Sequence, residues 1–224
     1  MDIGFVLFPN LTQLDLTGPL QVLHRMPGAR THLLASTLEP VPSDCGLSLL
    51  PSATFAEVPA VDLLCVPGGF GVSEAIEDEA LMNFVRACSR SASWLTSVCT
   101  GAFVLGAAGA LKGKRATTHW AYRDLLSAFG ATPTDARVVR DGNVMTGGGV
   151  TAGIDFALTL VAELHGEAVA QAIQLGMEYD PHPPFDAGSP SRAPAEIRDK
   201  LSAAYASKRR DFAAQLQSLD PSLG

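Results

Sequence analysis

Short runs of consecutive apolar residues alternate along the chain with longer segments in which apolar residues recur every three or four positions. The runs are typical of strands buried on both faces, and the longer segments of helices packed on a sheet. This alternation indicates an α/β fold with a parallel sheet covered by helices on both faces. The predicted core strands are 3–8, 32–36, 61–67 and 94–98, and the predicted helices are 14–25, 73–89, 103–111, 121–129, 152–164 and 167–177.

Other local signals complete the prediction. Asp141-Gly142-Asn143 joins two short apolar stretches and predicts a hairpin. Pro19 is expected in the first turn of the helix at 14–25, where proline is well tolerated. The Pro- and Ser-rich segment 39–55 predicts small edge strands or a hairpin. After an extended stretch at 179–194, a last helix is expected at 195–216, with one apolar stripe of Ile197, Leu201, Tyr205, Phe212 and Leu216.

Composition narrows the class of protein. Hydrophobic residues make up 47% of the chain and charged residues 17%, as in a compact globular domain. The net charge is −7 and the one basic cluster is Lys208-Arg209-Arg210, so no nucleic-acid partner is expected. No apolar run approaches the roughly 20 residues of a membrane span. Since the N-terminus also carries an acid, Asp2, where a signal peptide is basic, we expect a cytoplasmic protein with no membrane partner.

Four cysteines, Cys45, Cys65, Cys88 and Cys99, lack the CxxC spacing of zinc sites. In a reducing compartment they are expected to be free thiols. Cys45, Cys65 and Cys88 are interpreted as small buried apolar side chains. No group of His, Asp or Glu has metal-ligand spacing, so no metal is expected.

Cys99 is different because it stands between the predicted strand 94–98 and a helix. The carboxyl ends of parallel strands collect functional groups, and a nucleophile at such a sharp turn is exposed at the top of the sheet. Thr100-Gly101-Ala102 is small enough for the turn to close, although Ser97 replaces the first Gly of the G-x-S-x-G pattern. Amides at the helix start favour the thiolate. With those of Gly68-Gly69, they are expected to stabilise negative charge on a substrate.

The segment from Cys99 to Trp120 resembles the nucleophile region of the ThiJ/PfpI, or DJ-1-like, superfamily. The match runs from Ile3 to about Pro190 and is most similar to the bacterial isocyanide hydratases, with a likeness to the sensor half of AraC-type regulators. It implies a flavodoxin-like three-layer sandwich with a mostly parallel sheet, a DJ-1/PfpI domain over 1–190 and a helical extension over 191–224 packed on it. Three further motifs carry the resemblance: Gln13-Leu14-Asp15-Leu16-Thr17-Gly18-Pro19, Val66-Pro67-Gly68-Gly69 and Thr146-Gly147-Gly148-Gly149-Val150-Thr151-Ala152-Gly153-Ile154-Asp155.

The resemblance also implies a chemistry. Isocyanide hydratases convert R–N≡C to the N-substituted formamide, which here would use Cys99 as the nucleophile of a thioimidate intermediate. Asp15 stands where many superfamily members have Glu, and would be kept protonated beside the thiolate as proton donor and acceptor. The alternative is that Asp15 is the N-cap of the following helix. No cofactor is implied, and the family suggests a homodimer that takes a small isocyanide as substrate.

The remaining expected site residues are Thr100, Gly69 and Gly148, as backbone or hydroxyl contacts to the substrate. A histidine near the position of His119 assists the cysteine in proteolytic and glyoxalase-like relatives but not in the hydratases. Whether His119 takes part or is structural stays open at this point.

Two other function classes stay open. One is a regulatory protein similar to the AraC-type sensor domain, without hydratase activity, although the charge does not suit DNA. The other is a redox sensor in which Cys99 is oxidised. A peptidase or deglycase is disfavoured by Asp15 in place of Glu.

Overall fold

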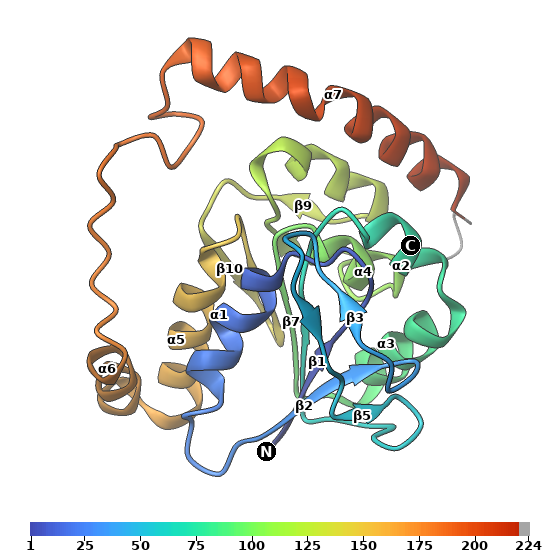
Figure 1. Cartoon of the computed structure of the whole chain (residues 1–224), viewed down its shortest axis with the longest axis vertical. Helices are drawn as coiled ribbons and strands as arrows, with labels where there is room; N and C mark the ends of the chain where they lie inside the picture. The colour runs from blue at the N-terminus through green and yellow to red at the C-terminus, as the bar shows by residue number, and fades with distance from the viewer. Residues whose placement is uncertain (220–224) are drawn as a thin grey trace.

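The computed structural model describes residues 1–219 and has a seven-stranded sheet at its centre (Figure 1). The strand order is β10-β11-β7-β6-β1-β2-β5. Neighbouring strands are parallel except β10 and β11, which form the predicted hairpin at one edge. The strands are β1 (Asp2–Val6), β2 (Arg30–Ala35), β5 (Ala53–Thr54), β6 (Leu63–Val66), β7 (Trp94–Val98), β10 (Val138–Asp141) and β11 (Val144–Gly147).

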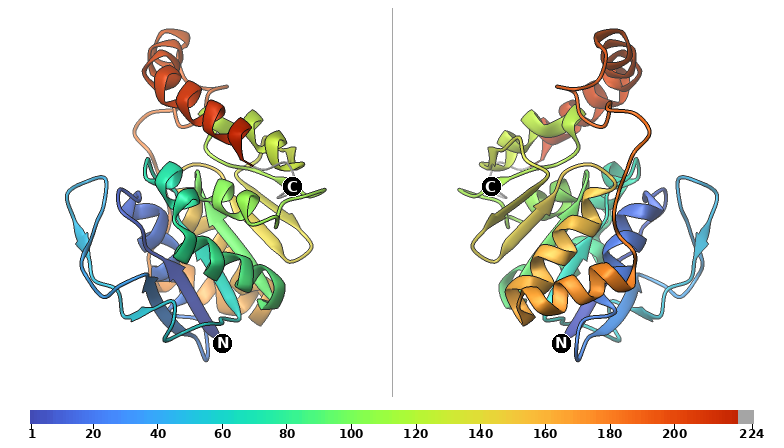
Figure 2. Two further views of the ribbon diagram at one scale, coloured as in Figure 1. Left: turned by 90° about the vertical axis from the view of Figure 1, so that its right-hand side faces the viewer. Right: turned by 90° about the vertical axis from the view of Figure 1, so that its left-hand side faces the viewer.

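Helices cover both faces of the sheet, so the predicted three-layer sandwich is confirmed (Figure 1, Figure 2). In one layer, α5 packs against both of its neighbours. This layer holds α1 (Gln13–Leu23), α5 (Ala152–His165) and α6 (Glu167–Gly176). The opposite layer holds α2 (Val72–Glu77), α3 (Glu79–Ser91), α4 (Gly101–Ala107) and the 3-10 helix η1 (Trp120–Phe129).

The register of the central strands determines where the chain leaves the sheet. Val66 of β6 pairs with Ser97 of β7, and Val98 pairs with Gly147 of β11. Because these strands are parallel, the residues that follow them leave at the same edge. The glycine turn after β6 and Cys99 after β7 are therefore neighbours.

The position of Pro19 differs from the prediction. Helix α1 begins at Gln13, so Pro19 lies in the helix interior rather than in the first turn. An interior proline removes one backbone donor from the helix. It is accommodated in the contact with α5, where a Cβ on Gly153 would lie only 2.8 Å from Pro19 Cδ. Close helix packing thus outweighs the local cost of the proline.

The helix predicted at 73–89 is in fact two helices. Asp78 is extended between α2 and α3 and caps α3, since its Oδ1 accepts hydrogen bonds from the amides of Ala80 and Leu81 at 2.9 and 3.1 Å. The apolar period continues across the break, which explains why one helix was predicted. Helix α4 also begins and ends earlier than the predicted 103–111.

Two small sheets lie outside the central one. β3 (Val41–Pro42) and β4 (Ser48–Leu49) form an antiparallel hairpin, in agreement with the predicted hairpin or edge strands. The amide of Asp44 in its turn donates to Leu11 O at 3.0 Å, which ties the hairpin to the loop after β1. The other small sheet pairs β8 (Arg115–Ala116) with β9 (Thr132–Pro133).

The chain after α6 runs extended and then forms α7 (Ala195–Ser218), which lies across η1 (Figure 1). Only the C-terminal half of its predicted apolar stripe is covered. Phe212 and Leu216 are buried, whereas Ile197 is 56% exposed and Leu201 41% exposed.

The structure also tests the expected burial of the cysteines. All four are free thiols, and Cys65 and Cys88 are buried as predicted. The expectation for Cys45 is wrong: it is exposed, because it lies in the turn of the small β3–β4 hairpin, away from the core. Within residues 1–219, none of the helices combines the length and apolar character needed to cross a membrane.

Candidate functional site

Cys99 occupies the sharp turn between β7 and α4 that the sequence predicts. Its φ of 54° is in the left-handed region, which is costly for a residue with a side chain. Two hydrogen bonds hold this conformation: the Cys99 amide donates to Gly147 O at 3.0 Å, and Thr118 Oγ1 donates to Cys99 O at 2.6 Å. Gly101 lets the turn close, because a Cβ there would collide with the carbonyl oxygens of Val66 and Pro67. The strain is thus maintained by the surrounding structure.

Asp15 is completely buried beside the cysteine. Its Oδ2 accepts a hydrogen bond from the Gly68 amide at 3.0 Å, and its carboxyl interacts with the Cys99 thiol. Its Oδ1 is also buried and has no hydrogen-bond partner among the described residues. The alternative role as an N-cap is wrong, because α1 begins at Gln13 with Thr12 as its N-cap and the Asp15 side chain bonds to another segment. The orphaned oxygen is a natural place for a proton.

Burial dominates the protonation of this pair. Loss of solvation raises the pKa of Asp15 to about 7, although the Gly68 amide and the Cys99 thiol act in the opposite direction. Burial and the negative charge of Asp15 also raise the pKa of the Cys99 thiol, while the Thr100 amide lowers it. The sequence suggested that the helix start favours the thiolate, but the helix start does not create one by itself. A thiolate here requires Asp15 to be protonated, and the two groups titrate together.

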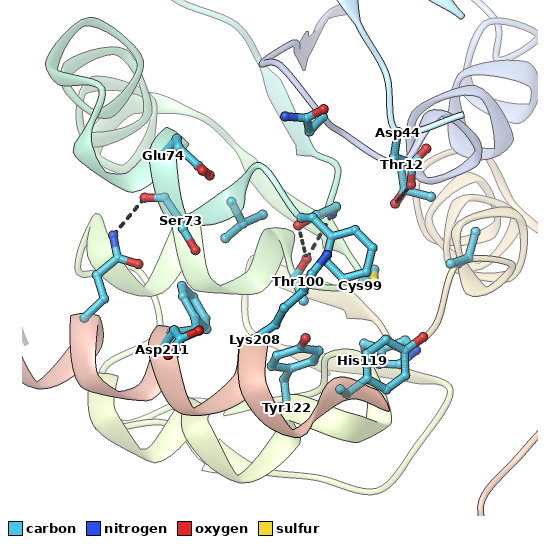
Figure 3. A pocket seen from close by; sticks show the side chains of 18 of the residues that line it. Thr12, Asp44, Ser73, Glu74, Cys99, Thr100, His119, Tyr122, Lys208 and Asp211 are labelled. Atoms are coloured by element: carbon cyan, nitrogen blue, oxygen red, sulfur yellow. Dashed lines mark hydrogen bonds between the residues drawn. The ribbon is translucent and has the colours of Figure 1, made fainter. Parts of the chain in front are cut away.

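Cys99 lines a cavity of about 900 Å³ that opens between α7, η1 and the loop after β6 (Figure 3), whereas Asp15 is not among the described residues that line it. Cys99 itself is only 6% exposed, so a substrate has to enter the cavity to reach the sulfur. The lining residues are Asn10, Thr12, Asp44, Gly69, Phe70, Val72, Ser73, Glu74, Glu77, Cys99, Thr100, His119, Tyr122, Val150, Tyr205, Lys208, Asp211, Phe212 and Gln215.

Thr100 and Gly69 both line this cavity, and they bind each other. The Gly69 amide donates to Thr100 Oγ1 at 3.0 Å, and the hydroxyl lies 3.1 Å from Gly69 O, to which it donates. A residue with a side chain would be strained at this position, because the φ of Gly69 is +131°. Both amides of the Gly68-Gly69 turn are therefore already bonded to the protein. This corrects the expectation that they are free to stabilise charge on a substrate.

Gly148 is not among the described residues that line the cavity. Its amide donates to Arg137 O at 2.9 Å, so it connects the end of β11 to the segment before β10. The structure does not bring this residue to the substrate side of Cys99.

His119 combines a structural contact with a place in the cavity wall. Its Nδ1 accepts the Ala121 amide at 3.4 Å as the N-cap of η1, and its ring lines the cavity. Burial and nearby Arg123 lower the pKa of His119 to about 4, so the ring is neutral at pH 7. Among the described residues no hydrogen bond joins it to Cys99. The neutral imidazole ring of His119 thus forms part of the cavity wall.

Comparison of this chain with known proteins shows which family has this sheet and turn. A sequence model of the DJ-1/PfpI family matches residues 1–163. The chain belongs to the DJ-1/PfpI family. The resemblance seen in the sequence is therefore confirmed, and this family's fold is shared by solved structures. The crystal structure of a ThiJ/PfpI family protein from Pseudomonas syringae matches with a TM-score of 0.94 at 44% identity, covering 96% of this chain and 90% of that chain.

Two curated relatives differ in function. The isonitrile hydratase of Pseudomonas putida is 56% identical over 200 residues, which cover 89% of this chain and 88% of that protein. The HTH-type transcriptional regulator GbdR of Pseudomonas aeruginosa is 32% identical over 80% of this chain but only 50% of the regulator. This DJ-1/PfpI chain is thus similar along most of its length to a hydratase, and to half of a regulator.

Several residues that line the cavity of this DJ-1/PfpI protein lie in no motif from which the sequence could predict them. Tyr122 comes from η1, Asp44 from the β3–β4 turn, and Lys208 from α7. Tyr205 did stand out in the sequence, but only as part of an apolar stripe. Its spacing could not show that the stripe faces Cys99. Residues 1–219 contain no group of three or more His, Cys, Asp or Glu side chains arranged to hold a metal ion.

Proposed function

We propose that this chain is an isocyanide hydratase, which adds water to R–N≡C and releases the N-substituted formamide. The observation that carries the proposal is the buried carboxyl of Asp15 against the thiol of Cys99, which lines a cavity large enough for an organic substrate. The high identity to an isonitrile hydratase over most of both chains supports the same reaction. We assign Cys99 as the nucleophile and Asp15 as the group that moves protons.

The first half of the reaction forms the thioimidate. With Asp15 protonated, the Cys99 sulfur attacks the isocyanide carbon and a carbon–sulfur bond forms. The electron pair left on that carbon takes the proton from Asp15, giving Cys–S–CH=N–R and an Asp15 carboxylate. Because burial raises the pKa of Asp15 to about 7, the acid form is available at neutral pH.

The second half adds water. The Asp15 carboxylate takes a proton from a water molecule while the water oxygen bonds to the thioimidate carbon. Asp15 then passes this proton to the substrate nitrogen. Collapse of the resulting adduct breaks the carbon–sulfur bond and returns the hydroxyl proton to Asp15. The products are R–NH–CHO, the Cys99 thiolate and protonated Asp15, so the atoms balance as R–NC plus water.

Thr100 and Gly69 are proposed to position the site by closing the loop over the pair through their mutual hydrogen bonds. His119 is proposed as a neutral wall rather than a base, since its Nδ1 is used by the Ala121 amide and its pKa is low. Neither role requires a group beyond this chain.

The proposal is tested by incubating the protein with an alkyl isocyanide and measuring formamide. Turnover is expected for the unaltered chain, with losses on the order of 10³-fold or more in Cys99→Ala and Asp15→Ala. Formamide release by Cys99→Ala at the normal rate would exclude Cys99 as the nucleophile. Lack of turnover by the unaltered chain would exclude the hydratase function.

The similarity to GbdR favours one second candidate, a regulatory domain without hydratase activity. The same assay separates the two, because a sensor would bind small molecules in the cavity without releasing formamide. The isonitrile hydratase match covers nearly all of its relative, whereas the regulator match covers half, and this favours the enzyme.

We also propose that the protein is a cytoplasmic homodimer in which residues 191–224 extend a domain formed by 1–190. Its four free thiols suit a reducing compartment. Exposed Ile197 and Leu201 continue the stripe of α7 and would suit a subunit contact. Light scattering coupled to gel filtration measures the mass directly, and a monomer at micromolar concentration would contradict the dimer.

A further inference from the structure

Helix α7 forms one wall of the cavity. Tyr205, Lys208, Asp211, Phe212 and Gln215 all line it. The other four lie 3, 6, 7 and 10 residues after Tyr205, which puts all five on one face of the helix. Figure 3 shows Lys208 rising from α7 into the cavity, opposite the loop that carries Thr100. Helix α7 is therefore placed against the same cavity as Cys99.

Several contacts fix α7 in this place. Arg209 donates to both oxygens of Asp124 on η1 at 3.0 and 2.6 Å, and to Ala121 O at 3.2 Å. Further along, Gln215 donates to Ser73 O at 2.9 Å and to Glu77 Oε1 at 2.8 Å on α2. Phe212 packs edge-on against Phe103 of α4, with ring centroids 4.9 Å apart. The wall is thus fastened to three elements of the core.

Tyr205 is the residue of this wall that joins the aromatic surface near the sulfur. Its ring centroid lies 5.5 Å from that of His119 and 6.1 Å from those of Trp120 and Tyr122. Burial and the nearby Cys99 charge raise the pKa of Tyr205, so its hydroxyl stays neutral. Three uncharged rings, those of His119, Tyr122 and Tyr205, therefore line the cavity together with Cys99.

We propose that Tyr205 is a specificity-determining residue, which favours isocyanides with a large uncharged substituent. This inference rests on the proposed hydratase function. The C–N≡C unit of an isocyanide is linear, so an isocyanide that presents its carbon to the Cys99 sulfur directs the substituent R away from the sulfur, into the outer cavity. A large R contacts the Tyr205 ring and buries apolar surface there, whereas a methyl group is too short to do so.

The experiment compares kcat/KM for benzyl isocyanide and methyl isocyanide in Tyr205→Ala and Tyr205→Phe. In Tyr205→Ala the value for benzyl isocyanide should fall about tenfold through KM, as expected for loss of one aromatic contact. The value for methyl isocyanide should stay within about twofold. Tyr205→Phe should keep both values. Leu201→Ala, one turn earlier on α7 and absent from the cavity lining, is the matched control and should change neither.

The possible outcomes are distinguishable. Equal losses for both substrates in Tyr205→Ala, or no loss for either, would overturn the specificity role while leaving the hydratase function in place. Absence of turnover by the unaltered chain would overturn both proposals. Thermal unfolding shows whether Tyr205→Ala is folded. If it is not, Tyr205→Leu replaces it, with the same loss of selectivity expected.

Discussion

The buried carboxyl of Asp15 is held against the Cys99 thiol by the Gly68 amide, which donates to Asp15 Oδ2 at 3.0 Å. Asp15 comes from the first turn of α1 and Cys99 from the turn after β7, so two distant segments supply one proton-sharing pair. Because both groups are buried, two negative charges are strongly disfavoured there. A thiolate therefore depends on the protonated acid.

Replacing Asp15 with Asn should change how stability depends on pH. The pKa of Asp15 is raised from 3.8 to about 7, so between these values the folded protein holds a proton that the unfolded chain releases. This contribution is complete below about pH 4 and is lost as pH rises through 7, about 4 kcal/mol in total. Asn cannot ionise, so Asp15→Asn should lose less stability between pH 5 and pH 8 than the unaltered chain.

Urea denaturation at the two pH values checks this expectation. Asp211→Asn, which removes an exposed carboxylate from α7, is the control and should keep the unaltered pH dependence. The same pH dependence in Asp15→Asn as in the unaltered chain would contradict a raised pKa of Asp15.

Asp44 should move the pH profile of the reaction. It lines the cavity, accepts a hydrogen bond from Thr12 Oγ1 at 2.6 Å, and its negative charge helps to raise the pKa of Asp15. Asp44→Asn should lower that pKa, so the pair with one proton, which supplies the thiolate and the acid together, persists to lower pH and the acid limb of the kcat/KM profile moves to lower pH. Measured pH profiles decide this. Glu74→Gln lines the same cavity and serves as the control, with no shift expected.

Gly101→Ala should destabilise the turn at Cys99. A Cβ at this position would lie 2.6 Å from Pro67 O and closer still to Val66 O, and backbone oxygens cannot move aside easily. We expect a loss of at least about 2 kcal/mol in unfolding free energy. Gly149→Ala is the matched control, because nothing lies within 4 Å of its Cβ, and it should stay within about 0.5 kcal/mol. Equal effects of the two changes in urea titrations would refute the steric argument.

Arg209→Met should loosen α7 without unfolding the core. The change removes the contacts to Asp124 and Ala121 O. Faster amide hydrogen exchange is expected in α7 while β6 and β7 stay protected, since local openings need less free energy than global unfolding. Arg210→Met is the control, because its side chain forms no ion pair within residues 1–219. Unchanged exchange in α7 of Arg209→Met would show that Phe212 and Gln215 alone hold the helix.

The sequence was sufficient for features that depend on neighbours along the chain. Continuous apolar runs reveal buried strands, and the step from strand to small residues to helix reveals the turn at Cys99. Local signals failed where a tertiary contact decided the outcome. Pro19 lies inside α1, where α5 packs on it. The break at Asp78 is local, since Asp78 caps α3, but the unbroken apolar period concealed it. Gly148 looked available in its motif, but its amide is used by Arg137 O.

By itself, the sequence determined the α/β layers, the family and the likeness that points to Cys99 and Asp15. These follow from periodicity and from motifs of consecutive residues. Only the tertiary structure decided that burial, rather than the helix start, governs the protonation of the pair, because solvent exclusion depends on segments distant in sequence. It also placed Tyr205 of the last helix in the cavity wall. An apolar stripe shows that a helix has a face to cover, and the fold determines what that face covers.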